Sequence, residues 1–223
     1  MKTLLLTLSL VIISPTLFSQ SITIGEDGIV RCKDVAIGTT EEINGVTYEV
    51  VDNLNLFEKI YDSDHPLNTL CTSNVTSLNF EDEPGAEGGN GNPFFYYGYD
   101  LSYRDFSKWD VSSVTDMSFF FSGAAYIKGI SNWDVSSVND MSNMFEYSQF
   151  DPDEETDISG WDVSNVKSMY GMFIGMDDSE YEAYHGYYTP FNQDLSKWNG
   201  GNVTRMNYMF YLSGINQDIS NWD

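Results

Sequence analysis

A nine-residue phrase, Trp-Asp-Val-Ser-x-Val-x-x-Met, recurs along the second half of this 223-residue chain. It starts at Trp109, Trp133 and Trp161, returns in altered form at Trp198, and begins once more at Trp222. A Phe follows each of the first four Trp residues by twelve positions. The Trp and Met side chains, which we expect in the core, are Trp109 and Met117, Trp133 and Met141, Trp161 and Met169, and Trp198 and Met206. A repeat at fixed register constrains the architecture more than any other feature does.

The spacing of the repeat gives the size of one unit. Successive tryptophans lie 24, 28, 37 and 24 residues apart, so the bare unit has 24 residues and the longer ones carry insertions. A degenerate copy runs from Leu70 to Leu78, with leucine in the Trp and Met positions. A unit this small cannot bury its own apolar face and must pack on its neighbours. We therefore predict an α/β solenoid, a leucine-rich-repeat-like stack of short strands and short helices.

The pattern inside each unit is the basis for its expected secondary structure. Val114, Met117, Phe120 and Phe121 fall at i, i+3, i+6 and i+7, a spacing typical of one face of a helix. Ser or Asn precedes the Val in every copy, as expected of a helix N-cap. Alternating residues before each Trp, as in 194–198, predict a brief strand.

The chain divides into three parts. Residues 1–19 are a predicted signal peptide, 20–66 a small β-rich N-terminal cap, and 67–223 the repeats, of which the last is truncated. Within the cap, the turn signal at Asn44 and Gly45 predicts a hairpin that includes 46–51, and 54–61 predicts a short helix.

The repeats resemble those of the BspA-type leucine-rich-repeat surface proteins of bacteria. The resemblance rests on the Trp-Asp-Val-Ser-x-Val-x-x-Met-x-x-Met-Phe string and on the segments 191–198 and 215–223, and it covers about 70–223. The segment 44–52 is similar to the lead-in before such repeats. The family implies export, surface display and binding or adhesion, and it implies no catalytic residues. The longer insertions and Asn199 in place of Asp depart from the family pattern.

The N-terminus and the cysteines indicate an oxidising compartment. Lys2 and the apolar run 4–13 precede a predicted cut before Gln20, and no cysteine near the cut offers a lipid anchor. We expect a secreted or cell-surface protein with no membrane insertion. Cys32 and Cys71 are the two cysteines, and we expect them to form a disulfide that joins the cap to the first repeat. Two buried thiols are the alternative.

The charge excludes one class of partner. The chain carries a formal charge of −24, and removal of Lys2 with the signal leaves 9 − 34 = −25. Nucleic acids and anionic membrane surfaces bind through Lys and Arg, so neither is expected as a partner. Divalent or cationic partners suit this charge better.

Acidic groups raise the question of Ca²⁺. Asp151, Asp153, Glu155 and Asp157 are spaced vaguely like a calcium loop, without the central Gly and the terminal Glu of an EF-hand. A solvated loop is the preferred interpretation, and a Ca²⁺ site is the alternative. The aspartates that follow the tryptophans, Asp110, Asp134 and Asp162, form a row if the units pack in register. Local capping of a turn is preferred there over a bound ion.

No catalytic motif stands out. His65 and His185 lie in no metal-binding spacing, and neither a nucleophile elbow nor a phosphate loop is present. We predict a binding or adhesion module without catalysis or cofactor, whose ligand is an extracellular protein or glycan. A carbohydrate-active or carbohydrate-binding accessory protein that uses the Tyr- and acid-rich loops is one alternative, and a passive spacer is another. The last repeat lacks a polar cap, which suggests either that the sequence is a fragment of a longer chain or that the open end makes an end-to-end contact.

Overall fold

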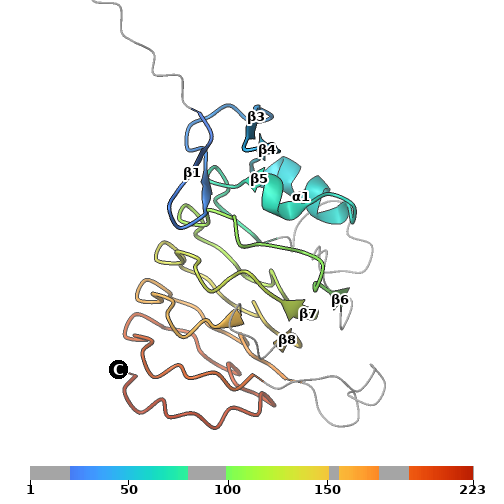
Figure 1. Ribbon diagram of the computed structural model, residues 1–223. Helices are drawn as coiled ribbons and strands as arrows, with labels where there is room; N and C mark the ends of the chain where they lie inside the picture. Colours follow the sequence, from blue (N-terminus) through green and yellow to red (C-terminus); the bar gives the residue numbers. More distant parts are fainter. Residues whose placement is uncertain (1–20, 80–98, 151–155, 176–190, 223) are drawn as a thin grey trace, which may run out of the picture.

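A computed structural model describes residues 21–79, 99–150, 156–175 and 191–222. Three small sheets and one α-helix make up its regular secondary structure (Figure 1). The helix and two of the sheets belong to the first 71 residues, and the third sheet joins the first repeats.

The N-terminal sheets are built from short strands. β1 (Thr23–Ile24) and β2 (Val30–Arg31) pair antiparallel. β3 (Thr40–Ile43) and β4 (Val46–Val50) form an antiparallel hairpin, and β5 (Leu70–Cys71) joins β4 in parallel. The hairpin turn consists of Asn44 and Gly45, with φ angles of 53° and 82°, residue types that tolerate this left-handed conformation. The predicted hairpin is confirmed.

The helix α1 (Asn53–Tyr61) follows β4 directly, which confirms the predicted helix. Asp52 caps its N-terminus by accepting hydrogen bonds from the backbone N–H groups of Leu54 and Asn55. A short 3₁₀ turn, η1 (Leu67–Thr69), then leads into β5.

A disulfide fastens this region to the first repeat. Cys32 and Cys71 are bonded, with a separation of 39 positions in sequence and 6.1 Å between their Cα atoms. Next to the bond, the backbone N–H of Cys32 donates to the Ser73 hydroxyl, which donates to the carboxylate of Asp110. These hydrogen bonds connect the disulfide to the first Trp-containing repeat as well.

Neighbouring repeats are joined by backbone hydrogen bonds. β6 (Tyr99–Asp100), β7 (Ala124–Ile127) and β8 (Gln149–Phe150) pair in parallel, one strand from each successive unit. Single parallel bridges continue the pairing at the seventh residue after each Trp position: Ser77 to Asp116 to Asp140 to Ser168 to Arg205. Figure 1 shows the green-to-red part of the chain running back and forth below the N-terminal sheets.

The segments that contain the regularly spaced Val, Met and Phe residues form successive turns. In the second repeat, the N–H groups of Met144 and Glu146 donate to the carbonyls three residues earlier, those of Met141 and Asn143. The N–H groups at alternate positions leave the turn and donate to carbonyls of the following repeat. These bonds, 2.7–3.0 Å long, are Met117 to Asp140, Phe119 to Ser142, Phe121 to Met144 and Gly123 to Glu146, and the same four recur from Met141 and from Met169 onward.

Left-handed residues make this alternation possible. The tenth residue after each Trp has a positive φ: 59° at Phe119, 55° at Asn143, 61° at Gly171 and 61° at Tyr208. Such a residue reverses the direction of the next peptide group, so half of the N–H groups face the neighbouring repeat and cannot form i to i−4 bonds.

The predicted fold class, an α/β solenoid of short strands and short helices, is therefore wrong. The structure has small mixed sheets, a disulfide and one α-helix, and that helix lies outside the repeats. The described repeats do not close into a solenoid. The stretches predicted as strands before each Trp, such as 194–198, form no strand. The spacing of the apolar residues led to the wrong prediction of a helix, because successive turns of three residues also place Val, Met and Phe on one side.

Aromatic rows form the core between repeats. Trp109 stacks on Trp133 at 6.2 Å between ring centroids, and Trp133 on Trp161 at 6.4 Å. Each indole N–H donates to the carbonyl three residues before the Trp position of the preceding repeat. The pairs are Trp109 with Leu67, Trp133 with Phe106, Trp161 with Ile130, Trp198 with Ile158 and Trp222 with Leu195. This bond fixes the register of the row, because a slipped neighbour would leave a buried indole donor unpaired.

One expected core residue is exposed. Met117, Met141 and Met169 are fully buried, and the four Trp residues assigned to the core are at most 4% exposed. Met206 is 44% exposed, which corrects the prediction for this side chain. The physical reason is that its counterparts are covered by the following repeat, and among the described residues no repeat turn follows 203–212.

A Gly-to-Ala pair tests the left-handed turns. Gly171 has a φ of 61°, and an added Cβ would lie 2.7 Å from Asn143 Nδ2 and 2.9 Å from Ile174 Cδ1. We expect Gly171→Ala to lower the free energy of unfolding by about 1–2 kcal/mol or more. Urea denaturation measures this, with Gly160→Ala as the control because nothing lies within 4 Å of its added Cβ. Equal stability of the two variants would contradict the turn geometry.

Removal of the disulfide tests the N-terminal staple. We expect the Cys32→Ala, Cys71→Ala double variant to lose about 2–4 kcal/mol of unfolding free energy, because the unfolded chain regains the entropy of a large loop. Urea denaturation with and without reductant measures the loss. Reductant should destabilise the wild type and leave the double variant unchanged. A wild type insensitive to full reduction would contradict the prediction.

Candidate functional site

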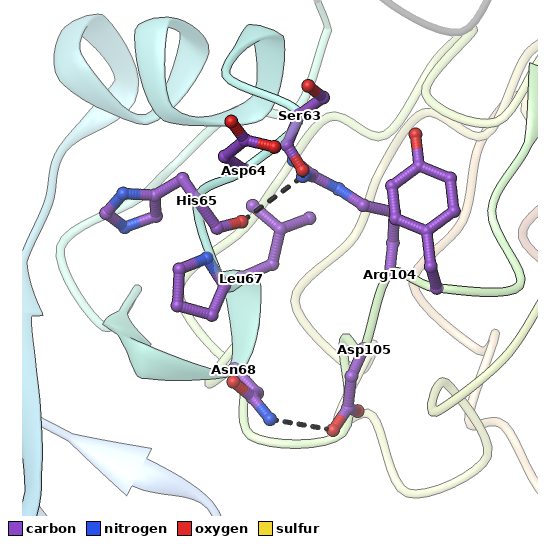
Figure 2. A pocket seen from close by; sticks show the side chains of 9 residues that line it. Ser63, Asp64, His65, Leu67, Asn68, Arg104 and Asp105 are labelled. Carbon is purple, nitrogen blue, oxygen red and sulfur yellow. Dashed lines mark hydrogen bonds between the residues drawn. The ribbon is translucent and has the colours of Figure 1, made fainter.

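A small pocket of about 240 Å³ lies where α1 meets the repeats. Its walls come from the 63–68 turn and from the loop at 103–105 (Figure 2). Asn68 donates a hydrogen bond to the carboxylate of Asp105 across its base, 3.1 Å long.

Arg104 lines this pocket and connects it to the end of α1. Its side chain is buried, and its guanidinium donates to the backbone carbonyls of Ile60, Asp62, Ser63 and His65, at 2.9–3.2 Å. These carbonyls lie at and just beyond the C-terminus of α1, where the helix leaves its last acceptors without partners and a cation is favoured. Arg104 therefore holds α1 against the repeats, and its donors point into the fold.

His65 is poorly placed for catalysis. Figure 2 shows its ring turned away from Arg104 and Asp105. Burial, followed by the charge of Lys59, lowers the pKa of its imidazole, so the ring is mostly neutral at pH 7. General-base catalysis needs a nucleophile within hydrogen-bond reach, and the Nε2 atom of His65 has no hydrogen-bond partner in the described structure.

The acidic residues have a common local role. In ten Asp-x-Ser sequences, the aspartate Oδ1 accepts a hydrogen bond from the backbone N–H of the serine two residues later, 2.8–3.2 Å away. The aspartates are Asp100, Asp105, Asp110, Asp116, Asp134, Asp140, Asp157, Asp162, Asp194 and Asp218. This is the Asx turn, in which a side chain replaces a backbone acceptor.

The Asx turns bear directly on the expected ion sites. Each aspartate of the row accepts from the serine two residues after it: Asp110 from Ser112, Asp134 from Ser136 and Asp162 from Ser164. Local capping of turns therefore explains the row without an ion. Of the four calcium candidates, Asp157 forms an Asx turn with Ser159, while Asp151, Asp153 and Glu155 lie outside the described residues. No group of three or more potential metal ligands occurs among the residues that the structure describes.

A cluster of tyrosines is the most distinctive exposed feature of the repeats. Tyr170 and Tyr208 meet edge to face at 5.8 Å between ring centroids, and Tyr208 and Tyr211 at 6.0 Å. The Arg205 guanidinium lies 5.3 Å from the centre of the Tyr170 ring. Tyr208 and Tyr211 are 60% and 55% exposed, although their rings are large and partly apolar. We call these four residues the tyrosine cluster.

The sequence pointed to other tyrosines. It singled out Tyr96, Tyr97, Tyr99, Tyr103 and the group at 181–188. Of these, Tyr99 and Tyr103 are described, whereas Tyr96, Tyr97 and the 181–188 group lie outside the described residues, as does His185. Tyr170, Tyr208 and Tyr211 were not singled out, because they sit at variable positions inside the repeat. Alignment of the repeats would have shown Tyr170 and Asn207 at the ninth position, with Tyr208 directly after, a signal for neighbouring rings.

Among the described residues, no helix is long and apolar enough to cross a bilayer. Residues 93–184 and 179–223 match the family model described as "Mycoplasma protein of unknown function, DUF285". Together the matches span 93–223, more than half of the chain. No curated protein and no solved structure matches it.

The Asx turns predict sensitivity to acid. Hydrogen bonds from the hydroxyl and N–H of Ser164 lower the pKa of Asp162, and those from Ser196 and Ser220 lower the pKa values of Asp194 and Asp218. A folded-state pKa below the unfolded value stabilises the fold above the unfolded pKa, and this stabilisation is lost as pH falls through the folded pKa. The triple variant Asp162→Asn, Asp194→Asn, Asp218→Asn keeps an oxygen acceptor but cannot be protonated. We expect its melting temperature to fall less than that of the wild type between about pH 5 and about pH 3.

A matched control separates turn chemistry from net charge. Glu26, Glu42 and Glu58 are exposed, and their conversion to Gln removes the same three charges. This variant should keep the wild-type decline in acid. If both triple variants flatten the decline equally, net charge is the cause and the prediction is wrong.

Proposed function

This chain belongs to the DUF285 family, whose function is unknown, and from its structure we propose that it is a non-catalytic binding module that recognises an extracellular protein through the tyrosine cluster. The observation that carries the proposal is the cluster of Tyr170, Tyr208 and Tyr211 beside Arg205.

Residue type and exposure support recognition at this place. Tyr and Arg are enriched among the residues that contribute most to protein–protein binding, because rigid rings bury large areas at small entropic cost. Tyr208 and Tyr211 leave more than half of their surface to solvent in this chain. Edge-to-face contacts already fix both rings relative to each other, so little side-chain freedom remains to be lost on binding.

The disulfide supports a place outside the cytoplasm. Bonds of this kind persist in oxidising compartments, and the one between Cys32 and Cys71 joins the N-terminal region to the first repeat. Together with the predicted signal peptide, it favours a secreted or surface-held protein. Residues 1–19 lie outside the described part of the chain.

The resemblance to BspA-type surface proteins stays a proposal, since the matched family is a separate one. It points in the same direction, toward display and adhesion. The carbohydrate-active alternative depended on the Tyr- and acid-rich insertion at 176–190, which lies outside the described residues, and no observation favours it. The spacer alternative gives no reason for an exposed cluster of ordered tyrosines.

Loss of one ring tests the proposal. The mature chain, residues 20–223, is screened against an array of purified extracellular matrix proteins and of glycans, and the strongest saturable signal is measured by surface plasmon resonance. We expect a protein ligand, and we expect Tyr211→Ala to weaken its binding by about 10-fold or more. Truncation of a central aromatic side chain of an interface removes buried area and ring contacts together.

An exposed tyrosine elsewhere provides the control. Tyr103 is 56% exposed but lies beside α1, outside the tyrosine cluster. Tyr103→Ala should bind as the wild type does. If Tyr103→Ala and Tyr211→Ala weaken binding equally, or if only glycans bind, the proposed surface or ligand class is wrong.

A further inference from the structure

The strand β3 forms one edge of the three-stranded N-terminal sheet. The strand order is β3-β4-β5, so β3 has a neighbouring strand on one side only, and Figure 1 shows it at the end of the fold away from the repeats. Its residues pair with β4 in the hairpin, from Ile43 with Val46 beside the turn to Thr40 with Glu49. The other long side of β3 is therefore a place where a further strand can be added.

The register of the hairpin shows which backbone groups point away from β4. In a hairpin with a two-residue turn, the residues that flank the turn exchange both hydrogen bonds, and every second residue along the strand does the same. Counted from the turn, Glu41 and Thr39 belong to this set, and the 2.9 Å bond from the Val50 N–H to the Thr39 carbonyl agrees. The N–H and C=O groups of Thr40 and Glu42 therefore point to the free side.

These four outward groups are accessible to a partner. Thr40 and Glu42 are exposed, and outside the hairpin no described residue donates to their carbonyls or accepts from their N–H groups. A strand added here would gain up to four backbone hydrogen bonds, which is a common way in which proteins bind extended segments. Because the hairpin already holds β3 extended, binding has to order the incoming segment alone.

Glutamate side chains make a second copy of β3 an unfavourable addition. The antiparallel register that bonds Thr40 of one copy to Glu42 of the other sets the two copies of Glu41 opposite each other. The next register, shifted by two residues toward the turn, sets the two copies of Glu42 opposite each other. Like charges directly opposite destabilise a pair of strands, and charged edge strands prevent association in this way. A strand with basic side chains would instead be attracted.

Glu42 supplies the uncompensated charge at this edge. On the same face of the sheet, Glu49 is already paired with Lys59, at 2.7 Å between the Oε2 and Nζ atoms. On the other face, the carboxylate of Glu41 accepts a 2.9 Å hydrogen bond from the backbone N–H of Ile22. Among the described residues, no ion pair or hydrogen bond engages the Glu42 side chain, so its charge is available to a partner.

The two faces of β3 determine which side chains an added strand should have. Glu42 lies opposite Thr47, on the same face as Thr40. Ile43 and Glu41 lie on the other face, where Ile43 packs against the apolar cluster around the disulfide. Residues directly opposite in antiparallel strands share a face. An added residue opposite Glu42 should therefore be basic, and one opposite Ile43 should be apolar.

We propose that the free edge of β3 binds an extended segment of another protein in which basic and apolar residues alternate, added as an antiparallel strand. The outward backbone groups supply the affinity, and the charge of Glu42 selects the partner. This inference goes beyond the proposed function, because β3 belongs to the N-terminal region and the tyrosine cluster to the repeats.

A short alternating peptide is the probe. Acetyl-Lys-Val-Lys-Val-Lys-amide can set a Lys opposite Glu42 with a Val opposite Ile43. We expect saturable one-to-one binding to the mature protein in an NMR titration at low salt. Methyl groups on the backbone nitrogens of the Lys residues remove the donors that face β3 and should weaken binding at least about 10-fold. Methyl groups on the Val nitrogens, which point away, should have little effect, and the peptide with Glu in place of Lys should not bind.

Amide hydrogen exchange of the protein tests the mode of binding. The N–H groups of Thr40 and Glu42 should exchange fast in the free protein and slow about 5-fold or more with saturating peptide. Glu41 and Ile43, whose N–H groups face β4, are internal controls that should change little.

Substitutions at the edge separate backbone pairing from charge. Thr40→Pro removes an outward N–H and leaves the bonds to β4 and the net charge unchanged, so it should weaken peptide binding at least about 5-fold. Glu42→Lys should also weaken it at least about 5-fold. Glu58→Lys makes the same charge change at an exposed position on α1 and is the control that should bind as the wild type does.

The outcomes distinguish this surface from the tyrosine cluster. Tyr211→Ala should keep the peptide bound, so a failure of one proposal leaves the other standing. Absence of peptide binding, equal binding of the peptide methylated at the Lys nitrogens, or equal loss of binding in Glu58→Lys and Glu42→Lys would each overturn the inference.

Discussion

The alternation of backbone N–H groups between neighbouring repeats is the constraint on which the rest of the structure depends. Within 117–123, every second N–H closes a turn and the others donate to the following unit. A single repeat therefore leaves half of these donors unpaired, and a buried unpaired N–H costs about 1–3 kcal/mol. The neighbouring repeat is a condition for the local conformation, so the turn and its packing must form together.

The same constraint decides which residues are tolerated at each position. The tenth residue must be left-handed, and Asn143 and Gly171 adopt that conformation at low cost. Phe119 and Tyr208 occupy the same position with φ angles near 60°, which is unfavourable for a bulky side chain. Because four hydrogen bonds per interface oppose this local cost, the geometry survives even where the residue type disfavours it.

Sequence reasoning succeeded where the local signal and the tertiary structure agreed. Asn44 and Gly45 suit the hairpin turn, and Asp52 with the apolar residues after it suits the start of α1. The burial of the Trp and Met positions, apart from Met206, also followed from their regular spacing. In these cases a short stretch of chain contains most of the information that its conformation requires.

The repeats were misassigned because side-chain spacing does not report backbone direction. Val114, Met117 and Phe121 lie on one face in a helix and also in a run of turns, so the apolar pattern cannot distinguish the two. The positive φ of Phe119 leaves no trace in its residue type. Two residues at the same repeat position, Asn143 and Gly171, favoured turns, because both types tolerate a positive φ. The N-cap residues before each Val favoured a helix instead, and the prediction followed them.

The candidate sites were only partly predictable, for a related reason. Arg104 is one residue among ten basic ones in the sequence, and its role appears only when the end of α1 is placed beside it. The aspartates, in contrast, could be assigned to turns from the Asp-x-Ser spacing alone. Much of the acidic character of the repeats thus follows from turn chemistry, and a large negative charge is weak evidence for a bound cation.

The hydrogen-bond pattern also gives the row of repeats a direction. Each turn donates at alternate N–H groups to the unit after it, whereas the N–H two residues before the first of these donates to the unit before it, as Asn139 does to Thr115, so the two sides of a unit are chemically different. At the N-terminal end, the side-chain oxygen of Asn53 accepts from Thr76 and Ser77, as the Lys167 carbonyl accepts from Thr204 and Arg205. A single side chain can stand in for one carbonyl of a missing repeat.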